Sequence, residues 1–150
     1  MPQSLASLHS HIIFSTKNRI PDLKLEWQPR LHAYLGGILR SHGGKLLAAG
    51  GMPDHIHLLV SMSRDTSVSE IVRLLKSNSS GWIHATFPDR KGFAWQTGYA
   101  AFAVSYSHLA AVKHYILAQE KHHRKKSFQE ELLAFLKRHD LKFDERYLWD

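Results

Sequence analysis

Residues 50–60 limit the possible folds most, because a turn sequence leads directly into an uninterrupted apolar run. The turn sequence Gly-Gly-Met-Pro-Asp at 50–54 precedes the run Ile-His-Leu-Leu-Val at 56–60. A short apolar run closed in front by Gly and Pro is typical of a buried β-strand. Residues 45–49 predict a second strand, and we expect the two strands to pair as a hairpin around the turn at 50–54.

The order of the other hydrophobic patterns extends this hairpin to a fold class. Alternating or apolar runs predict strands at 8–14 and, interrupted by Gly98, within 93–105; helical periodicity predicts helices at about 26–41, 67–87, 107–122 and 127–139. The resulting order β-α-β-β-α-β is that of an α+β, ferredoxin-like (RRM-like) antiparallel sheet with additional C-terminal helices. We expect one domain over residues 1–150, with a core at about 8–123 and a helical tail at about 124–150.

The composition excludes some functions and favours others. The 150 residues include no cysteine, which removes disulfides and thiolate chemistry. No apolar stretch approaches the length of a membrane span, so we expect a cytoplasmic protein with no membrane partner. The formal charge of +7, with twelve histidines in addition, suits a polyanionic partner such as nucleic acid.

Two histidines on the predicted hairpin strand form half of a possible metal site. Side chains on a strand alternate between its two faces, so His55 and His57 project from the same side at a spacing of about 7 Å. Paired strand histidines also occur as packed or solvated residues, and His9 and His11 repeat the pattern on the first strand. The pair therefore needs further ligands elsewhere in the chain.

The helix predicted at 107–122 offers such groups. Tyr115 and Gln119 lie one turn apart, about 40° from each other around the helix, and His108 and His122 share that face at seven residues on either side of Tyr115. The alternative is a core tyrosine beside a surface glutamine. Two imidazoles with one amide oxygen can hold a divalent ion and leave open positions, a mixed site that suits Mg²⁺ or Mn²⁺.

These residues resemble the single-tyrosine HUH transposases of small bacterial insertion sequences (IS200-like) and their REP-associated tyrosine transposase relatives. The motifs that carry the resemblance are Asp-His-Ile-His at 54–57, Tyr-Ile-x-x-Gln at 115–119, Leu-Lys-Ser-Asn-Ser-Ser at 75–80, Trp-x-x-Gly-Tyr at 95–99 and Ile-Ile-Phe-x-x-Lys-x-Arg at 12–19. They occur in the family's order from about residue 8 to 123. Ser10 replaces a common aromatic residue, and the tail at 124–150 matches nothing catalytic.

The resemblance implies metal-assisted transesterification on single-stranded DNA. Tyr115 would be the nucleophile that forms a 5′-phosphotyrosine, and His55, His57 and Gln119 would bind Mg²⁺ or Mn²⁺. His122 is a candidate to assist from just outside the ligand set. Relatives of this length are commonly homodimers in which the tyrosine helix of one chain completes the metal site of the other, so we expect a homodimer with an active site assembled in trans, while the sequence leaves assembly in cis open.

The expected DNA partner is a single strand that contains a hairpin at the end of the element. Basic and hydroxyl side chains near the motifs are candidates to contact its phosphates, and unpaired bases could stack on Trp95 or Tyr99. The candidate DNA-binding residues are Lys17, Arg19, Lys76, Ser79, Ser80, Lys121 and Arg124.

Three other functions are compatible with parts of this pattern. A metal-dependent phosphodiesterase would use the metal to activate water and would form no covalent adduct. A domesticated single-stranded nucleic-acid-binding protein would keep the fold without the chemistry. A histidine-rich zinc-binding protein would use His9, His11, His122 and His123 instead.

Overall fold

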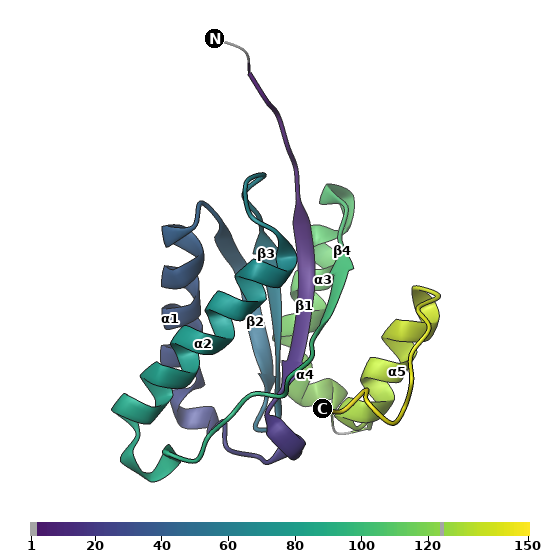
Figure 1. Cartoon of the computed structure of the whole chain (residues 1–150). Coiled ribbons are helices and arrows are strands. Elements are labelled where there is room, and N and C mark those ends of the chain that lie inside the picture. Colours follow the sequence, from purple (N-terminus) through teal and green to yellow (C-terminus); the bar gives the residue numbers. More distant parts are fainter. Residues whose placement is uncertain (1–2, 124) are drawn as a thin grey trace.

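The computed structural model describes residues 3–123 and 125–150, and its centre is a four-stranded antiparallel sheet. The strands are β1 (His9–Ser15), β2 (Lys45–Met52), β3 (His55–Ser61) and β4 (Ala100–Ala103), in the order β2-β3-β1-β4. β2 and β3 form the expected hairpin (Figure 1). The α+β class with an antiparallel sheet is confirmed.

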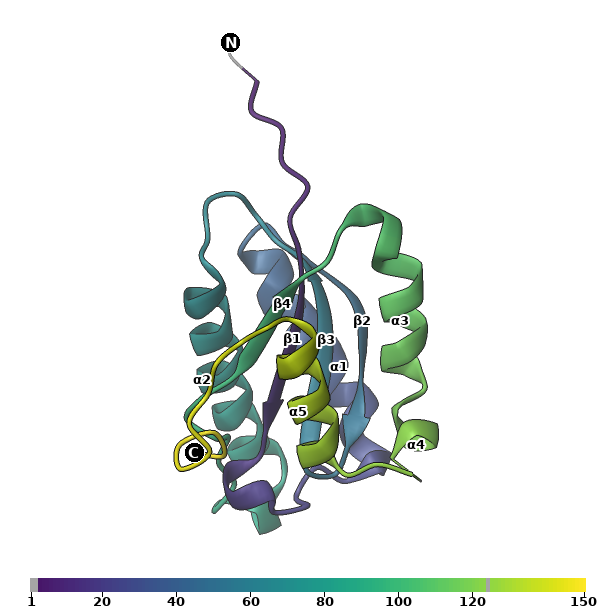
Figure 2. The ribbon, with the colours of Figure 1, turned by 90° about the vertical axis from the view of Figure 1, so that its right-hand side faces the viewer.

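Helices cover both faces of the sheet. Helices α1 (Gln28–Ser41) and α2 (Val68–Thr86) lie on one face, and α3 (Leu109–Leu117), α4 (Gln119–His122) and α5 (Phe128–Arg138) lie on the other (Figure 1). Figure 2 shows α5 in front of the middle of the sheet, with α3 and α4 beside it. No helix in the described part of the chain has the length and apolar character needed to cross a membrane.

Strand alternation explains how the sheet separates its core from its histidines. Ile56, Leu58 and Val60 of β3 are at most 1% exposed and belong to the hydrophobic cluster formed with α1 and α2. The intervening His55 and His57 project to the opposite face, under α3, α4 and α5. Burial of one face thus fixes the direction in which the histidine pair points.

The tail helix α5 packs on the sheet. Ser127 caps its first turn in a reciprocal capping box with Glu130, which defines where the helix begins. Its apolar side, formed by Phe128, Leu132 and Leu136, contacts Ile13 and Phe102 of the sheet. The helix expected at 127–139 therefore exists and lies over the histidine-bearing face.

The hairpin turn differs from the sequence expectation. We expected residues 50–54 to form the turn, but β2 continues to Met52 and only Pro53 and Asp54 connect the strands. Gly50 is a strand residue opposite His57, and a Cβ atom added to it would lie 2.2 Å from the carbonyl oxygen of Ile116. The missing side chain allows α3 to approach β2 closely.

The single helix expected at 107–122 is broken. A short 3₁₀ turn at Tyr106–His108 precedes α3, and Ala118, with φ −101° and ψ 21°, separates α3 from α4. Tyr115 and Gln119 therefore do not lie on one continuous helix. The segment within 93–105 also contains less strand than expected: β4 covers four residues, and Trp95 forms an isolated bridge with Thr16.

Lys76, a candidate DNA-binding residue, has internal partners. Its ammonium group donates to the carbonyl oxygens of Gln96, Thr97 and Gly98, with the first two distances at 2.8 and 3.2 Å. Burial lowers the pKa of Lys76 to about 8. In this position the side chain fastens the segment before β4 to α2.

Lys76→Met is therefore expected to lower the free energy of unfolding by about 2 kcal/mol, because hydrogen bonds from a charged donor are lost and their carbonyl partners are left behind. Urea denaturation measures this change. Lys142→Met, at an exposed lysine, is the control and should leave the midpoint unchanged. Equal stability of the two variants would show that the contacts of Lys76 contribute nothing.

Candidate metal centre and nucleophile

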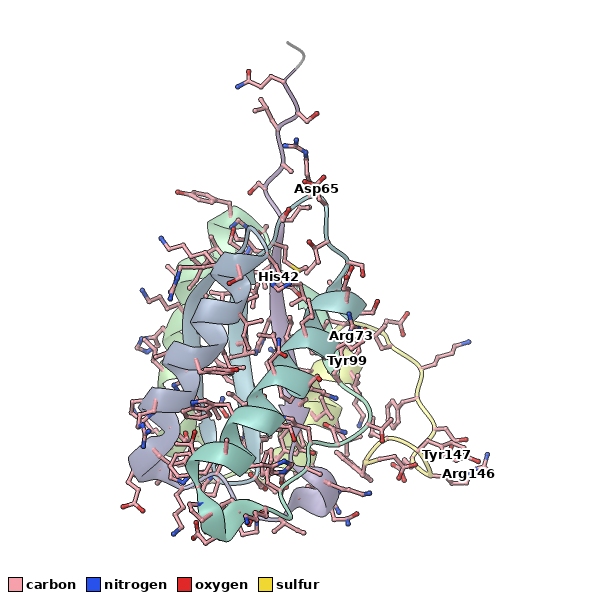
Figure 3. All side chains as sticks on the ribbon, turned by 60° about the vertical axis from the view of Figure 1, so that its left-hand side comes forward. His42, Asp65, Arg73, Tyr99, Arg146 and Tyr147 are labelled. Atoms are coloured by element: carbon pink, nitrogen blue, oxygen red, sulfur yellow. The ribbon has the colours of Figure 1, made fainter. Side chains whose placement is uncertain are left out.

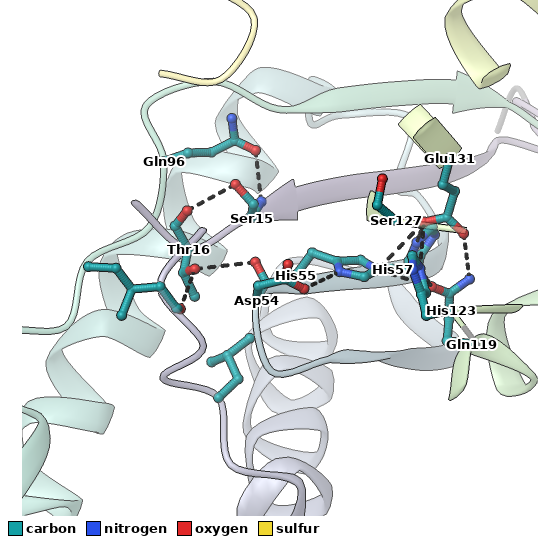
Figure 4. A network of polar contacts seen from close by, with 12 residues as sticks. Ser15, Thr16, Asp54, His55, His57, Gln96, Gln119, His123, Ser127 and Glu131 are labelled. Atoms are coloured by element: carbon teal, nitrogen blue, oxygen red, sulfur yellow. Dashed lines mark hydrogen bonds and ion pairs between the residues drawn. The ribbon is translucent and has the colours of Figure 1, made fainter. Parts of the chain in front are cut away.

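Polar side chains from β3, α4 and α5 meet under the tail helix (Figure 4), and Tyr115 of α3 joins them. His55 and His57 are 1% and 0% exposed, and their ring centroids lie 5.2 Å apart. The sequence expectation that both project from one face of a buried strand agrees with these positions. Their burial means that each ring nitrogen needs a partner.

The Nδ1 atoms of the two histidines are both engaged away from the centre of the cluster. Nδ1 of His55 lies 2.7 Å from a carboxylate oxygen of Asp54, and Nδ1 of His57 lies 2.8 Å from Nε2 of His11. Such outer partners fix the orientation of metal-ligating imidazoles. Both Nε2 atoms consequently point toward the oxygens of α4 and α5.

Two oxygen-bearing side chains face these nitrogens. Oε1 of Gln119 lies 3.1 Å from Nε2 of His55, and Oε1 of Glu131 lies 2.9 Å from Nε2 of His57. One candidate ligand atom from each of His55, His57, His123 and Glu131 lies within 4.8 Å of the others. Several buried lone pairs that converge in this way fit a divalent cation, since imidazole and carboxylate groups are common ligands of such ions.

The hydroxyl of Tyr115 joins the same cluster by donating a hydrogen bond to Oε2 of Glu131. Burial and the neighbouring carboxylate raise the pKa of Tyr115 above its ordinary range, whereas Gln119 and Arg138 act in the opposite direction. Burial by itself would raise the pKa of Glu131, but His123 and His57 hold that pKa well below its usual range. The cluster thus contains a neutral phenol on an ionised carboxylate.

The sequence identified part of this cluster and missed two members. His123 approaches Oε1 of Gln119 at 3.0 Å and Oε1 of Glu131 at 3.1 Å, whereas His122 stacks on the ring of Tyr115 with centroids 4.3 Å apart. The spacing of four residues between Gln119 and His123 was a usable signal. The sequence also contains a signal for Glu131, because it is an acidic residue between Phe128 and Leu132 on the apolar side of α5.

The candidate DNA-binding residues occupy different environments. Lys17 and Lys121 are exposed, and the guanidinium of Arg19 lies 5.5 Å from the ring centroid of Trp149. Ser79 is fully buried and accepts a hydrogen bond from the indole of Trp95 at 2.9 Å, while Ser80 is half-buried. Arg124 lies outside the described residues.

The four histidines of the zinc hypothesis do not gather into a separate site. His11 and His123 belong to the cluster around His55 and His57, while His9 contacts the ring of Tyr106 at 6.4 Å between centroids. His122 lies on Tyr115. Within the described residues, the histidines therefore support one polar centre.

Acid is expected to destabilise the metal-free protein. Burial lowers the pKa of His57 to about 4 and that of His11 to about 3, so between these values and about 6.5 the unfolded chain binds more protons than the folded one. As the pH is lowered through this range, the free energy of unfolding should decrease by up to about 1.4 kcal/mol per pH unit for each histidine. The lowered pKa of Glu131 adds to this loss of stability once the pH falls below the pKa of a glutamate in the unfolded chain. The raised pKa of His123 acts in the opposite direction.

Thermal melts of the protein in chelator between pH 7.5 and pH 5 would measure this dependence, using buffers of matched ionic strength. A melting temperature that stays constant or rises on acidification would contradict the neutral, buried state of His57 and His11.

Comparison with known families gives the class of this protein, a transposase. The chain belongs to the family described as "Transposase IS200 like", whose model matches residues 4–119. It is 29% identical over 117 residues to the ISDra2 transposase TnpA of Deinococcus radiodurans, across 75% of this chain and 84% of that protein.

Solved structures show the same fold. The crystal structure of a proposed transposase from Deinococcus radiodurans R1 is similar with a TM-score of 0.64 and 29% identity, over 77% of this chain and 95% of that one. A REP-associated tyrosine transposase bound to a REP hairpin is similar with a TM-score of 0.54 and 17% identity, over 77% of this chain and 66% of that one. The family match ends at residue 119, so His123 and α5 lie outside it.

Proposed function

We propose that this transposase cleaves and rejoins single-stranded DNA by transesterification, with Tyr115 as the nucleophile. The observation that carries the proposal is the convergence of the Tyr115 hydroxyl, the Nε2 atoms of His55 and His57, and the oxygens of Gln119 and Glu131 at one point of the sheet face. A phenol beside a candidate metal centre suits covalent attack on a phosphodiester, because metal coordination is one of the ways in which such a nucleophile is activated.

A divalent ion, Mg²⁺ or Mn²⁺, would be held by His55, His57 and Gln119. His123 and Glu131 are placed to complete the ligand set, since their candidate donor atoms lie in the same cluster. When bound, the ion would polarise the scissile phosphate and favour the ionised form of the phenol. The Nδ1 contacts with Asp54 and His11 would keep the two strand histidines in the required orientation.

The reaction exchanges one phosphodiester for another. The Oη atom of Tyr115 would form a bond to the scissile phosphorus, the bond from phosphorus to the 3′ oxygen would break, and that oxygen would take up a proton to leave as a 3′-hydroxyl. Glu131 accepts the phenol hydrogen bond and would hold Oη in place, while the proton lost by the phenol would be the one that the 3′ oxygen takes up. Attack by a second 3′-hydroxyl on the 5′-phosphotyrosine would complete strand transfer without an energy source.

The proposed substrate is a single strand with a hairpin near the cleavage site. Membership of the transposase family and the REP hairpin bound by a protein of the same fold support this choice. We further propose a homodimer in which each active site is assembled in cis, because Tyr115 and both strand histidines of one chain already meet. This arrangement does not need the exchange of helices between subunits.

The test is incubation with single strands from the DNA that flanks the gene, labelled at either end, with Mn²⁺ or Mg²⁺ and analysis on a denaturing gel. The proposal predicts that the 3′-labelled fragment migrates with the protein and that the 5′-labelled fragment is released with a free 3′-hydroxyl. Cleavage that releases both fragments from the protein would instead indicate a hydrolytic phosphodiesterase. Adduct formation on the 5′-labelled fragment would overturn the assigned polarity.

A further inference from the structure

A pocket of about 440 Å³ opens beside the proposed nucleophile, between the α3–α4 segment and the tail helix α5. Tyr115 and His122 form part of one wall, and Arg138 of α5 forms part of the other. The pocket is distinct from the cluster of metal-ligand candidates, although Glu131 borders both.

The charge of this pocket is strongly positive. Lys121, Lys125, Lys126 and Arg138 line it, and none of these four forms an ion pair within residues 3–123 and 125–150. Glu131 contributes the carboxylate in its wall, and the oxygens of that group are engaged by imidazoles, Tyr115 and Gln119. Cations that gather in a concave surface without acidic partners attract an anion.

Two further observations link the pocket to the reacting group. Tyr115 and Arg138 line the same pocket, so the phenol ring and the arginine side chain border one space. The ring of His122 stacks on Tyr115, and its Nε2 atom is shielded from solvent without a hydrogen-bond partner in the described part of the chain. A buried imidazole nitrogen of this kind is satisfied when a ligand supplies a hydrogen-bond partner.

We propose that this pocket binds a backbone phosphate of the DNA strand next to the scissile phosphodiester, with Arg138 and Lys121 as its principal ligands. The inference rests on the proposed function, because it assumes that a DNA strand reaches Tyr115. Arg138 would present a planar pair of donors to the phosphate oxygens, and Lys121 would add a point charge from the opposite wall.

The tail, which the family match does not cover, would have a role in DNA binding. Arg138 lies beyond residue 119, where the match to the family model ends. Helix α5 docks on the sheet through Phe128, Leu132 and Leu136, which holds Arg138 facing the pocket. The tail would thus contribute to binding of the strand that Tyr115 cleaves.

The experiment measures DNA binding without chemistry. Fluorescence anisotropy of a labelled single strand from the flanking DNA, in chelator, would be recorded for the wild type, Arg138→Gln, Lys121→Gln and Arg73→Gln. Arg73 is the matched control, because it is an exposed arginine on α2, on the opposite side of the sheet (Figure 3). Arg138 and Lys121 are themselves exposed, so their substitution should not disturb folding, and a thermal melt verifies this.

Loss of a charge-assisted contact in the pocket should weaken binding roughly tenfold for Arg138→Gln. It should also reduce the slope of log affinity against log salt by about 0.7 per lost phosphate contact on a single strand. Lys121→Gln should behave in the same direction, Arg138→Lys should restore part of the affinity, and Arg73→Gln should bind as the wild type does.

Three results would overturn the subsite. Equal weakening by Arg138→Gln and Arg73→Gln would indicate a general effect of charge, unchanged binding would exclude a phosphate contact, and tighter binding would show that α5 excludes DNA. Because no metal or cleavage is involved, these results are independent of the adduct assay. If the wild type forms the adduct and Arg138→Gln binds DNA as the wild type does, only the phosphate subsite is wrong. If Arg138→Gln loses binding but the wild type forms no adduct, only the proposed transesterification is wrong.

Discussion

Tyr115→Phe is expected to abolish the covalent protein–DNA adduct and to reduce strand cleavage by roughly a thousandfold or more, the scale seen when a nucleophile is removed from an enzyme. The substitution removes one oxygen atom and keeps the ring that stacks on His122. Without Oη no bond to phosphorus can form from this position, and no other hydroxyl in the described residues hydrogen-bonds to Glu131. The measurement is a denaturing gel with labelled single-stranded DNA and Mn²⁺.

The stability of this variant separates chemistry from folding. Glu131 loses one donor but keeps contacts with His57, His123 and Gln119, so we expect a change in unfolding free energy of about 1 kcal/mol. Tyr106→Phe makes the same chemical change at a 78% exposed phenol and should leave cleavage intact. Cleavage that survives in Tyr115→Phe would show that water or another group is the nucleophile.

Local patterns in the sequence predicted the parts of the site that depend on one element at a time. Alternation along β3 places His55 and His57 on one face whatever the rest of the fold does, because the period of a strand is two residues. The strand patterns at 45–49 and 56–60 predicted the hairpin, although its turn is shorter than the expected segment 50–54. The order of the patterns then led to the antiparallel sheet.

The remaining parts of the site depend on contacts between distant segments, which periodicity does not encode. Glu131 lies 74 residues from its partner His57, and only the docking of α5 on the sheet brings them together. His123 reaches the cluster instead of His122 because the chain turns at Ala118, which shifts the phase of α4 relative to α3. Lys76 could not be distinguished from a surface cation until its three carbonyl partners were known.

Gly50 shows how a residue without functional groups positions the nucleophile. It pairs with His57 across the hairpin and lies against the backbone carbonyl of Ile116, the residue that follows Tyr115. A Cβ atom at this position would be 2.2 Å from that oxygen, so backbone atoms of α3 would have to move. Any such movement displaces the phenol relative to Glu131 and the strand histidines.

Gly50→Ala is therefore expected to lower the free energy of unfolding by about 1–3 kcal/mol through overpacking. If α3 shifts by about 1 Å, cleavage should fall by roughly a hundredfold, because the attacking oxygen leaves its aligned position. Urea denaturation and the single-strand cleavage assay measure the two effects separately.

Gly81→Ala is the matched control for this substitution. Gly81 is an exposed residue inside α2, and an added Cβ atom there meets nothing within 4 Å. The same change should raise the free energy of unfolding by about 0.5–1 kcal/mol, since alanine favours the helix, and should leave cleavage unchanged. Gly50→Ala with full stability and full activity would show that α3 can retreat from β2 without moving Tyr115, and that the close approach of these two elements does not position the nucleophile.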